Sequence, residues 1–166
     1  MLRYAWELMS VFLASLTPAV EVRGSIPLTY YFFSEEPSMK VIGVAVAVTA
    51  NLLIAPVVLS FLDRLNDFLT GLGGRFLFIR NAYVKVVGSA RAKGRKYVGR
   101  WGYVGLALFV AVPLPGSGAW TGSLIAYLFG LKYRASVLSI EVGVLAASAI
   151  ITFALEAGLH FLGFPR

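Results

Sequence analysis

A glutamate and an arginine lie two residues apart inside an apolar stretch of this 166-residue chain. Glu21 and Arg23 interrupt the hydrophobic segment 8–34, within the sequence PAVEVRGSIP at 18–27. An arginine stays charged and suits a phosphate or carboxylate, whereas a desolvated glutamate could carry a proton. These two residue types therefore predict an anion site coupled to protons. In the alternative interpretation, the two side chains only neutralise each other and fix the loop.

A second apolar stretch, 102–131, contains no charge and breaks in the middle at PLPGSG, residues 113–118. Proline lacks an N–H and disfavours continuing a helix, so both breaks predict irregular backbone. Irregular backbone and charges at membrane depth are costly and persist where they line a cavity or an ion path. This pattern indicates transport. The residues predicted to form the two tips are Pro18, Pro27, Pro113, Pro115, Gly116 and Gly118.

The composition indicates an all-α integral membrane protein. Hydrophobic residues make up 58% of the chain and the mean hydropathy is +0.79, more than the core of a small soluble protein can bury. Segments 41–62 and 135–158 exceed the roughly 20 residues that a helix needs to cross a bilayer. With no cysteine and one histidine, we expect no disulfide, metal or cofactor.

The positive charge of the chain is concentrated in segment 63–100, which has nine basic and two acidic residues. A basic stretch beside membrane segments marks the cytoplasmic side, and its interleaved apolar residues suit the headgroup layer. We therefore predict a cytoplasmic, interfacial helical linker in a protein of the plasma membrane. Nucleic-acid binding would use similar charge, but is not expected beside so much membrane.

The chain predicts a single membrane domain, 1–166, built from two similar halves, 1–62 and 101–166. Each half has a broken apolar segment, 5–34 or 102–131, followed by one span. The uncharged arms 8–20 and 24–34 have thirteen and eleven residues, too short to cross alone. Re-entrant hairpins also place Lys132 and Arg134 on the cytoplasmic side, which the positive-inside rule favours over kinked spans. Two such halves form an inverted-topology repeat, with binding expected near the midplane.

At each tip the outgoing half-helix would begin near the midplane and direct its free N–H groups inward, where an anion could bind. Candidate binding residues beside Glu21 and Arg23 follow from this geometry, with serine or threonine as helix caps. Trp120 could close the cavity or only pack. The candidates at the tips are Gly24, Ser25, Ser117, Trp120 and Thr121.

Two further polar residues lie within the predicted spans. Glu141 is seven residues beyond Arg134, about 10 Å into its span, and could line a polar path or reach back to a cytoplasmic base. Asn51 could bind a ligand, but an interhelical hydrogen bond is the favoured prediction.

The sequences EVRGSIP at 21–27 and PLPGSGAWTG at 113–122 resemble the paired signature of the small multidrug export proteins. That family is similar to the DedA, or SNARE-associated Golgi protein (VTT-domain), superfamily. The resemblance covers nearly the whole chain and implies two re-entrant hairpins, each packed with a transmembrane helix. For the wider superfamily it implies proton-dependent movement of lipids, including polyprenyl phosphate carriers. Glu21 resembles the acidic residue of the first hairpin, whereas Gly118, Trp120 and Thr121 stand where DedA proteins carry arginines.

Three functions remain open from the sequence. The favoured one is a transporter or scramblase of an anionic lipid, with membrane lipids and protons as partners. The second is export of small organic cations, with Glu21 or Glu141 as the binding charge. The third is a membrane assembly factor that transports nothing. An enzyme is not expected, since no nucleophile–base pair or phosphate-binding loop occurs. The small size makes a homodimer plausible.

Overall fold

The computed structural model describes residues 4–71, 77–78, 81–85, 87–88 and 101–161. Those residues are helical or in turns, and no strand occurs among them, which confirms the all-α prediction. Loop residues 112–118 and the turn 17–20 separate pairs of short helices. The helices are α1 (Ala5–Leu16), α2 (Glu21–Phe32), α3 (Pro37–Leu52), α4 (Ile54–Gly71), α6 (Trp101–Ala111), α7 (Ala119–Phe129) and α8 (Tyr133–Phe161).

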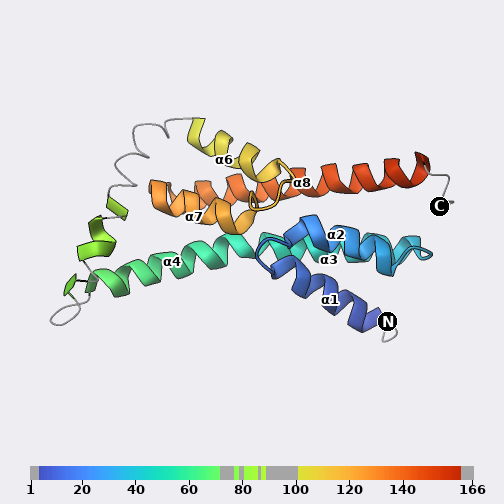
Figure 1. Ribbon diagram of the computed structural model, residues 1–166, viewed down its shortest axis with the longest axis horizontal. Coiled ribbons are helices and arrows are strands. Elements are labelled where there is room, and N and C mark those ends of the chain that lie inside the picture. Colours follow the sequence, from blue (N-terminus) through green and yellow to red (C-terminus); the bar gives the residue numbers. More distant parts are fainter. Residues whose placement is uncertain (1–3, 72–76, 79–80, 86, 89–100, 162–166) are drawn as a thin grey trace.

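Two long helical stretches run in opposite directions along the longest axis of the molecule (Figure 1). One is α8, with 29 residues, and the other is formed by α3 and α4 over Pro37–Gly71. At 1.5 Å per residue α8 is about 43 Å long, longer than the roughly 30 Å of a bilayer's hydrocarbon core. Both stretches are long and apolar enough to cross a membrane, and they contain the predicted spans 41–62 and 135–158.

The predicted span 41–62 is not one uninterrupted helix. A turn at Leu53 separates α3 from α4, close to Pro56. Proline cannot donate a backbone hydrogen bond, and its ring disturbs the carbonyl four residues earlier, here that of Leu52. The helix also continues past residue 62 to Gly71, so the first nine residues of the predicted linker belong to α4.

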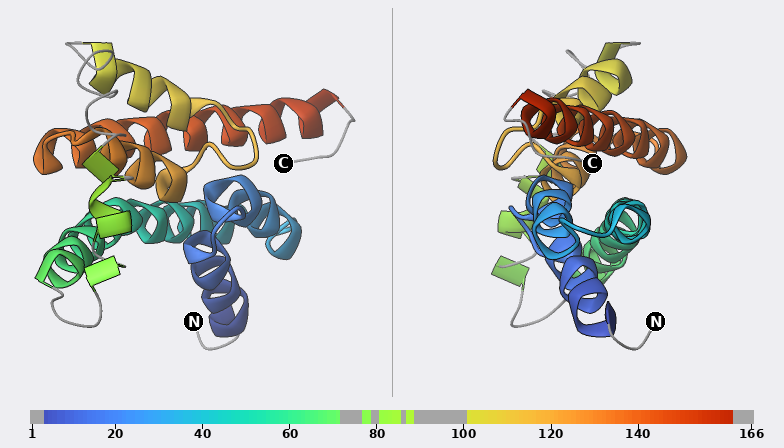
Figure 2. Two further views of the ribbon diagram at one scale, coloured as in Figure 1. Left: turned by 60° about the vertical axis from the view of Figure 1, so that its left-hand side comes forward. Right: turned by 90° about the vertical axis from the view of Figure 1, so that its right-hand side faces the viewer.

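The four short helices form two hairpins that flank the long ones. Each has 11 or 12 residues and is therefore about 17 to 18 Å long, roughly half of the hydrocarbon thickness. The α1–α2 hairpin packs on α3, whereas α6 packs on α8 and α7 packs on α4. Figures 1 and 2 show that the loops of both hairpins lie near the middle of the molecule.

The first hairpin turns earlier in the sequence than the prolines predict. Helix α2 already begins at Glu21, so Arg23 and Pro27 are helical residues, and only Pro18 lies in the turn. The assignment of Pro27 to the tip was therefore wrong. A helix tolerates this proline near its start because only one hydrogen bond within the helix is lost, the one that residue 27 would donate to the Arg23 carbonyl.

Glycines set the closest helix packing. A Cβ at Gly143 of α8 would lie 2.6 Å from Val110 Cβ and 2.7 Å from the Ala107 carbonyl oxygen of α6. A Cβ added at Gly122 of α7 would lie 2.8 Å from Val110 Cγ2. Small residues let membrane helices approach until their backbones touch, which maximises van der Waals contact.

Buried hydrogen bonds join α1 to α3. Ser15 donates to the Ala47 carbonyl at 2.5 Å, and Asn51 Nδ2 donates to the Ser15 carbonyl at 2.9 Å. All three residues are fully buried. Asn51 therefore makes the interhelical hydrogen bond that the sequence favours for it.

Large apolar side chains cover the outside of the molecule. Trp6 is 82% exposed and Phe153 76% exposed, on helices at opposite sides of the fold. Soluble proteins rarely leave so much contiguous apolar surface in water. Lipid is the environment that such a surface requires. Other exposed examples are Met9, Phe61, Phe68, Val104, Leu108, Leu138, Val142 and Leu145.

The described part of the linker contacts the end of the second hairpin. The hydroxyls of Tyr83 and of Tyr127 in α7 are hydrogen-bonded to each other, and each lies 3.2 Å from Asn66 Oδ1 of α4, which accepts from the hydroxyl that does not donate to its neighbour. Of the nine basic residues in 63–100, only Arg64 and Lys85 are described; the others lie outside the described residues.

Replacing Gly143 by alanine is expected to lower the stability of the protein by about 1 to 3 kcal/mol, because the added methyl group overpacks the α6–α8 contact. Gly158→Ala on the same helix is the matched control, since a Cβ added there would meet nothing within 4 Å. It should leave stability unchanged or raise it slightly through helix propensity. Thermal unfolding in detergent measures both, and equal melting temperatures would contradict the packing role.

Candidate functional site

The two hairpin loops meet at a carboxylate. Glu21, the first residue of α2, is 3% exposed and extends to the first residues of α7. Its Oε2 accepts a hydrogen bond from the Ala119 amide at 3.2 Å, and its Oε1 accepts one from the Trp120 amide at 3.1 Å. The first amides of a helix have no partner within that helix and lie at its positive end. Glu21 therefore acts as the anion bound at the start of α7.

A glycine makes room for this carboxylate. The N-cap of α7 is Gly118, and a Cβ there would lie 1.5 Å from Glu21 Oε2 and 2.2 Å from its Cδ. No side chain fits at this position while Glu21 stays in place. Gly118 is thus required by the contact between the hairpins, and not by its own backbone angle, since its φ is −87°.

Arg23 completes the junction from the same helix. Its Nη1 forms an ion pair with Glu21 Oε2 at 2.7 Å. Its Nη2 donates to the carbonyls of Val110 and Val112 at 3.0 and 3.1 Å and to Ser117 Oγ at 3.1 Å. The guanidinium thereby binds Glu21 of its own hairpin and, in the second hairpin, the last turn of α6 and the loop that follows it.

The two charges match the polarity of the helix ends that they contact. The carbonyl of Val110, which Arg23 contacts, lies in the last turn of α6, the negative end of that helix. The carboxylate of Glu21 lies at the start of α7, which is the positive end of that helix. Burying an ion pair costs several kcal/mol per ion, and hydrogen bonds to backbone groups of both signs offset that cost.

The backbone at the first tip is strained. Ala19 has a φ of 71° and Glu21 a φ of 47°, in the left-handed region that residues other than glycine rarely adopt. Such a conformation costs on the order of 1 to 3 kcal/mol and persists only where the surrounding contacts impose it. At this tip, the contact of the Glu21 carboxylate with α7 is the one that holds the strained backbone in place.

The predicted helix caps at the tips were wrong. Neither α2 nor α7 has a side-chain cap at its N-cap residue. The Ser117 hydroxyl instead has the carbonyls of Val112 and Leu114 as acceptors for its one hydrogen, at 2.7 and 2.9 Å. Ser25 lies inside α2, fully buried, and Thr121 lies in the first turn of α7. The α7 amides of Ala119 and Trp120, where Ser117 or Thr121 was expected to act, instead donate to Glu21 from the other half of the chain.

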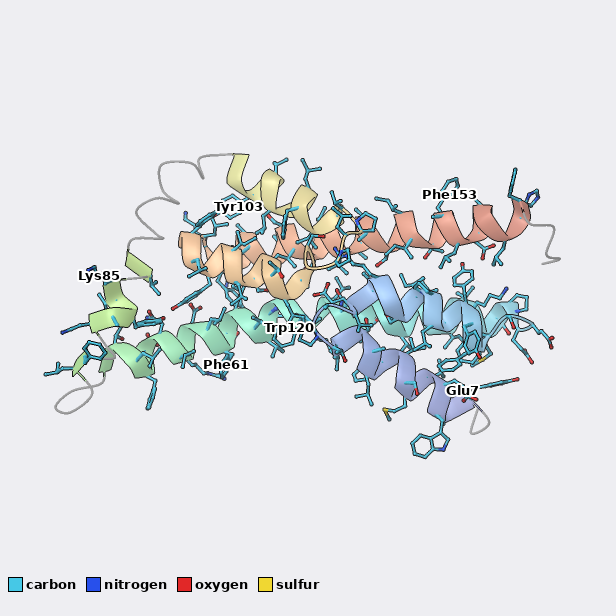
Figure 3. The ribbon with its side chains drawn as sticks, viewed as in Figure 1. Glu7, Phe61, Lys85, Tyr103, Trp120 and Phe153 are labelled. Atoms are coloured by element: carbon cyan, nitrogen blue, oxygen red, sulfur yellow. The ribbon has the colours of Figure 1, made fainter. Side chains whose placement is uncertain are left out.

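Other predicted site residues lie around the junction. Trp120, labelled in Figure 3, lies where the hairpins meet, and its Nε1 donates to the Leu16 carbonyl at the end of α1 at 3.1 Å. Gly24 packs against Val20, whose Cγ1 would lie 2.5 Å from an added Cβ. The loop residues Pro18, Pro113, Pro115 and Gly116 are exposed at the outer side of the tips.

Glu141 and Asn51 are not part of this hydrogen-bonded junction. Glu141 is half-buried on α8 and has no hydrogen bond or ion pair with any described residue. Sequence reasoning missed the carbonyls of Val110 and Val112, and no signal could have found them, because backbone acceptors are available in every residue. Among the described residues, no group of three or more histidine, cysteine, aspartate or glutamate side chains could hold a metal ion.

Comparison with known proteins places the chain in a family. Residues 21–150 match the model of the family described as "Putative small multi-drug export protein". The chain belongs to this family. The match begins at Glu21, directly after the turn of the first hairpin, and includes the loop of the second hairpin and most of α8. The family and the apolar helices together identify a membrane protein of an export family. No match was found among curated proteins or among solved structures.

A double-mutant cycle tests the contact between Gly118 and Glu21. Gly118→Ala should destabilise the protein by about 3 kcal/mol, because the methyl group displaces a buried carboxylate from its partners. In a Glu21→Ala background the same change should cost less than about 1 kcal/mol, since the space is then empty. Gly105→Ala, which meets nothing within 4 Å, serves as the control. Additive effects in thermal unfolding would show that the two residues do not interact.

Proposed function

We propose that this protein is a proton-coupled membrane transporter or scramblase of an anionic lipid or polyprenyl phosphate carrier. The observation that carries the proposal is the buried Glu21 carboxylate, bound by Arg23 and by the first amides of α7. These donors form a site for an anion, and a side chain of the protein occupies it. A phosphate has the charge and the acceptor atoms to take its place.

In this mechanism protonation of Glu21 exposes the site. A neutral carboxyl group binds Arg23 and the helix amides more weakly than a carboxylate does. The lipid phosphate then binds Arg23 and the α7 amides while Glu21 carries the proton. Loss of the proton restores the carboxylate, which competes with the phosphate and displaces it. One proton thus accompanies each anion that enters the site.

The topology belongs to the proposal. Hairpins of half the bilayer thickness, with their loops near mid-length, suit two re-entrant hairpins arranged as an inverted repeat. Linker 63–100 would then lie on the cytoplasmic side of the plasma membrane. The outer sides of both tips, including Thr17, Pro18 and Gly116, are exposed. Irregular backbone at that depth requires water or protein around it, so a water-filled path or a second copy of the chain would cover these tips. A homodimer remains a prediction.

Export of small organic cations is the second candidate, and the family's description favours it. At the hairpin junction, however, both oxygens of Glu21 are satisfied by Arg23 and the α7 amides. A cation would meet no free negative charge there and would be repelled by Arg23. Half-buried Glu141 would have to supply the binding charge instead. A membrane assembly factor without transport remains the third alternative, and no enzymatic activity is proposed.

Topology can be tested directly, because the chain contains no cysteine. The single substitutions Glu35→Cys and Lys132→Cys introduce one labelling site each at positions near opposite ends of the fold. With re-entrant hairpins, Lys132→Cys should react with an impermeant maleimide from the cytoplasmic side and Glu35→Cys from the other side. Reaction of both positions from the same side would contradict the hairpins and favour four kinked spans.

Transport of a labelled anionic lipid in reconstituted vesicles tests the roles of the two charges. Arg23→Gln should slow lipid movement by at least about tenfold, because a charge-assisted contact to the phosphate is lost. Glu21→Gln should permit movement but remove its dependence on a proton gradient, since the amide resembles the protonated carboxyl. Lys132→Gln, far from the junction, is the control.

Arg23→Gln leaves Glu21 buried without its partner, so the double variant Glu21→Gln/Arg23→Gln controls for folding. It has no charge at the junction and should fold but remain slow. Lipid movement at the wild-type rate in the folded double variant would rule out an anion site at the junction. Proton-driven uptake of an organic cation that survives Arg23→Gln would support the second candidate.

A further inference from the structure

A groove of about 920 Å³ lies between α2, α3 and α8, away from the Glu21–Arg23 pair. Its lining includes Tyr30 of α2, Lys40 of α3 and Glu156 of α8. Tyr30 follows Arg23 by seven residues, about 10 Å along the helix. The groove is therefore a separate place on the molecule, near the turn between α2 and α3 and the last turns of α8.

Two opposite charges in this groove share one tyrosine as neighbour. The Lys40 ammonium lies 5.7 Å from the centre of the Tyr30 ring, and the Tyr30 hydroxyl donates to Glu156 Oε1 at 2.7 Å. Lys40 and Glu156 do not form an ion pair with each other, nor does either have one with any other described residue. The groove thus presents a positive and a negative group about one tyrosine side chain apart, both able to bind a ligand.

We propose that the groove binds the headgroup of a zwitterionic phospholipid that has a primary amine, a phosphatidylethanolamine. Lys40, at the face of the Tyr30 ring, binds its phosphate, and Glu156, beside the Tyr30 hydroxyl, binds its ammonium. A ligand with only one sign of charge would be repelled by one of the two groups. A zwitterion matches both, because its charges are on neighbouring groups joined by a short link.

The surroundings of the two charges favour a lipid over a soluble zwitterion. Val41, 71% exposed, and Phe153, 76% exposed, belong to the groove lining and provide apolar surface for acyl chains. Polar residues Ser34 and His160 also line the groove. A mixture of tyrosine, lysine and apolar side chains at the end of a membrane-spanning helix is typical of the headgroup level of a bilayer.

The acceptor at Glu156 favours a primary ammonium over a quaternary one. A carboxylate forms charge-assisted hydrogen bonds with N–H groups, which a trimethylammonium group lacks. Phosphatidylcholine should therefore bind more weakly than phosphatidylethanolamine. Phosphatidylglycerol, with a phosphate and no ammonium, should bind most weakly because Glu156 then repels it.

Native mass spectrometry of the purified, delipidated protein tests this site. Phosphatidylethanolamine, phosphatidylcholine and phosphatidylglycerol with identical acyl chains are added separately, and the fraction of protein that retains one lipid is measured. Retention should decrease in that order. Glu156→Gln should lower retention of phosphatidylethanolamine about fivefold, a moderate effect because Glu156 is exposed to solvent. Lys40→Gln should lower retention of both zwitterionic lipids.

Glu35→Gln and Lys132→Gln remove charges that do not line the groove, and retention should not change. Thermal unfolding of each variant shows whether it is folded; the Glu156→Gln amide oxygen can still accept from Tyr30. Equal retention of phosphatidylethanolamine and phosphatidylglycerol, or full retention by folded Glu156→Gln, would overturn the proposal. Displacement of the lipid by millimolar free phosphoethanolamine would overturn it in favour of a soluble zwitterion site. The assay measures binding alone, so its outcome is independent of lipid movement at Arg23.

Discussion

The structure depends on one buried ion pair that is shared between two helix ends. Glu21 and Arg23 both belong to α2, so their attraction to each other would not by itself link the two hairpins. The link arises because each charge is also bound by the other hairpin, Arg23 by carbonyls at the end of α6 and Glu21 by amides at the start of α7. Without those backbone groups the pair would carry a large desolvation cost. Without the pair, the amides of Ala119 and Trp120 would lose the acceptor that Glu21 provides in an apolar molecule.

This mutual requirement explains several local features that look costly in isolation. Helix α6 ends and α7 begins at the junction, where their ends supply a carbonyl for Arg23 and amides for Glu21. Gly118 must lack a side chain, and Glu21 must adopt a left-handed backbone angle, so that the carboxylate can reach α7. The long helices α8 and α3–α4 pack against the hairpins, through close contacts at Gly143 and buried hydrogen bonds at Ser15.

The sequence predicted the parts of this arrangement that depend on composition and local chemistry. Apolar length identified the two long stretches, and the prolines and glycines of 113–118 located the second loop. It did not predict that Glu21 would replace serine as the cap of α7, because the partners are 98 residues apart and capping preferences describe neighbours in sequence. It also placed Pro27 at the tip, although tertiary contacts let a helix begin before this proline. A proline predicts that a helix is disturbed nearby, but it does not predict whether the helix begins before or after the proline.

The filled state of the junction limits how the proposed transport could operate. An open anion pore would leave Arg23 and the α7 amides free, whereas here a carboxylate of the protein occupies them. A substrate anion must therefore compete with Glu21, and the competition can be won only when the carboxylate is neutralised or moved. Neutralisation by a proton keeps the charge of the buried site constant when a singly charged headgroup arrives, so the membrane interior never has to hold an uncompensated ion. In the proposed mechanism, a coupled exchange at Glu21 would for this reason be energetically more favourable than diffusion of the anion past Arg23 alone.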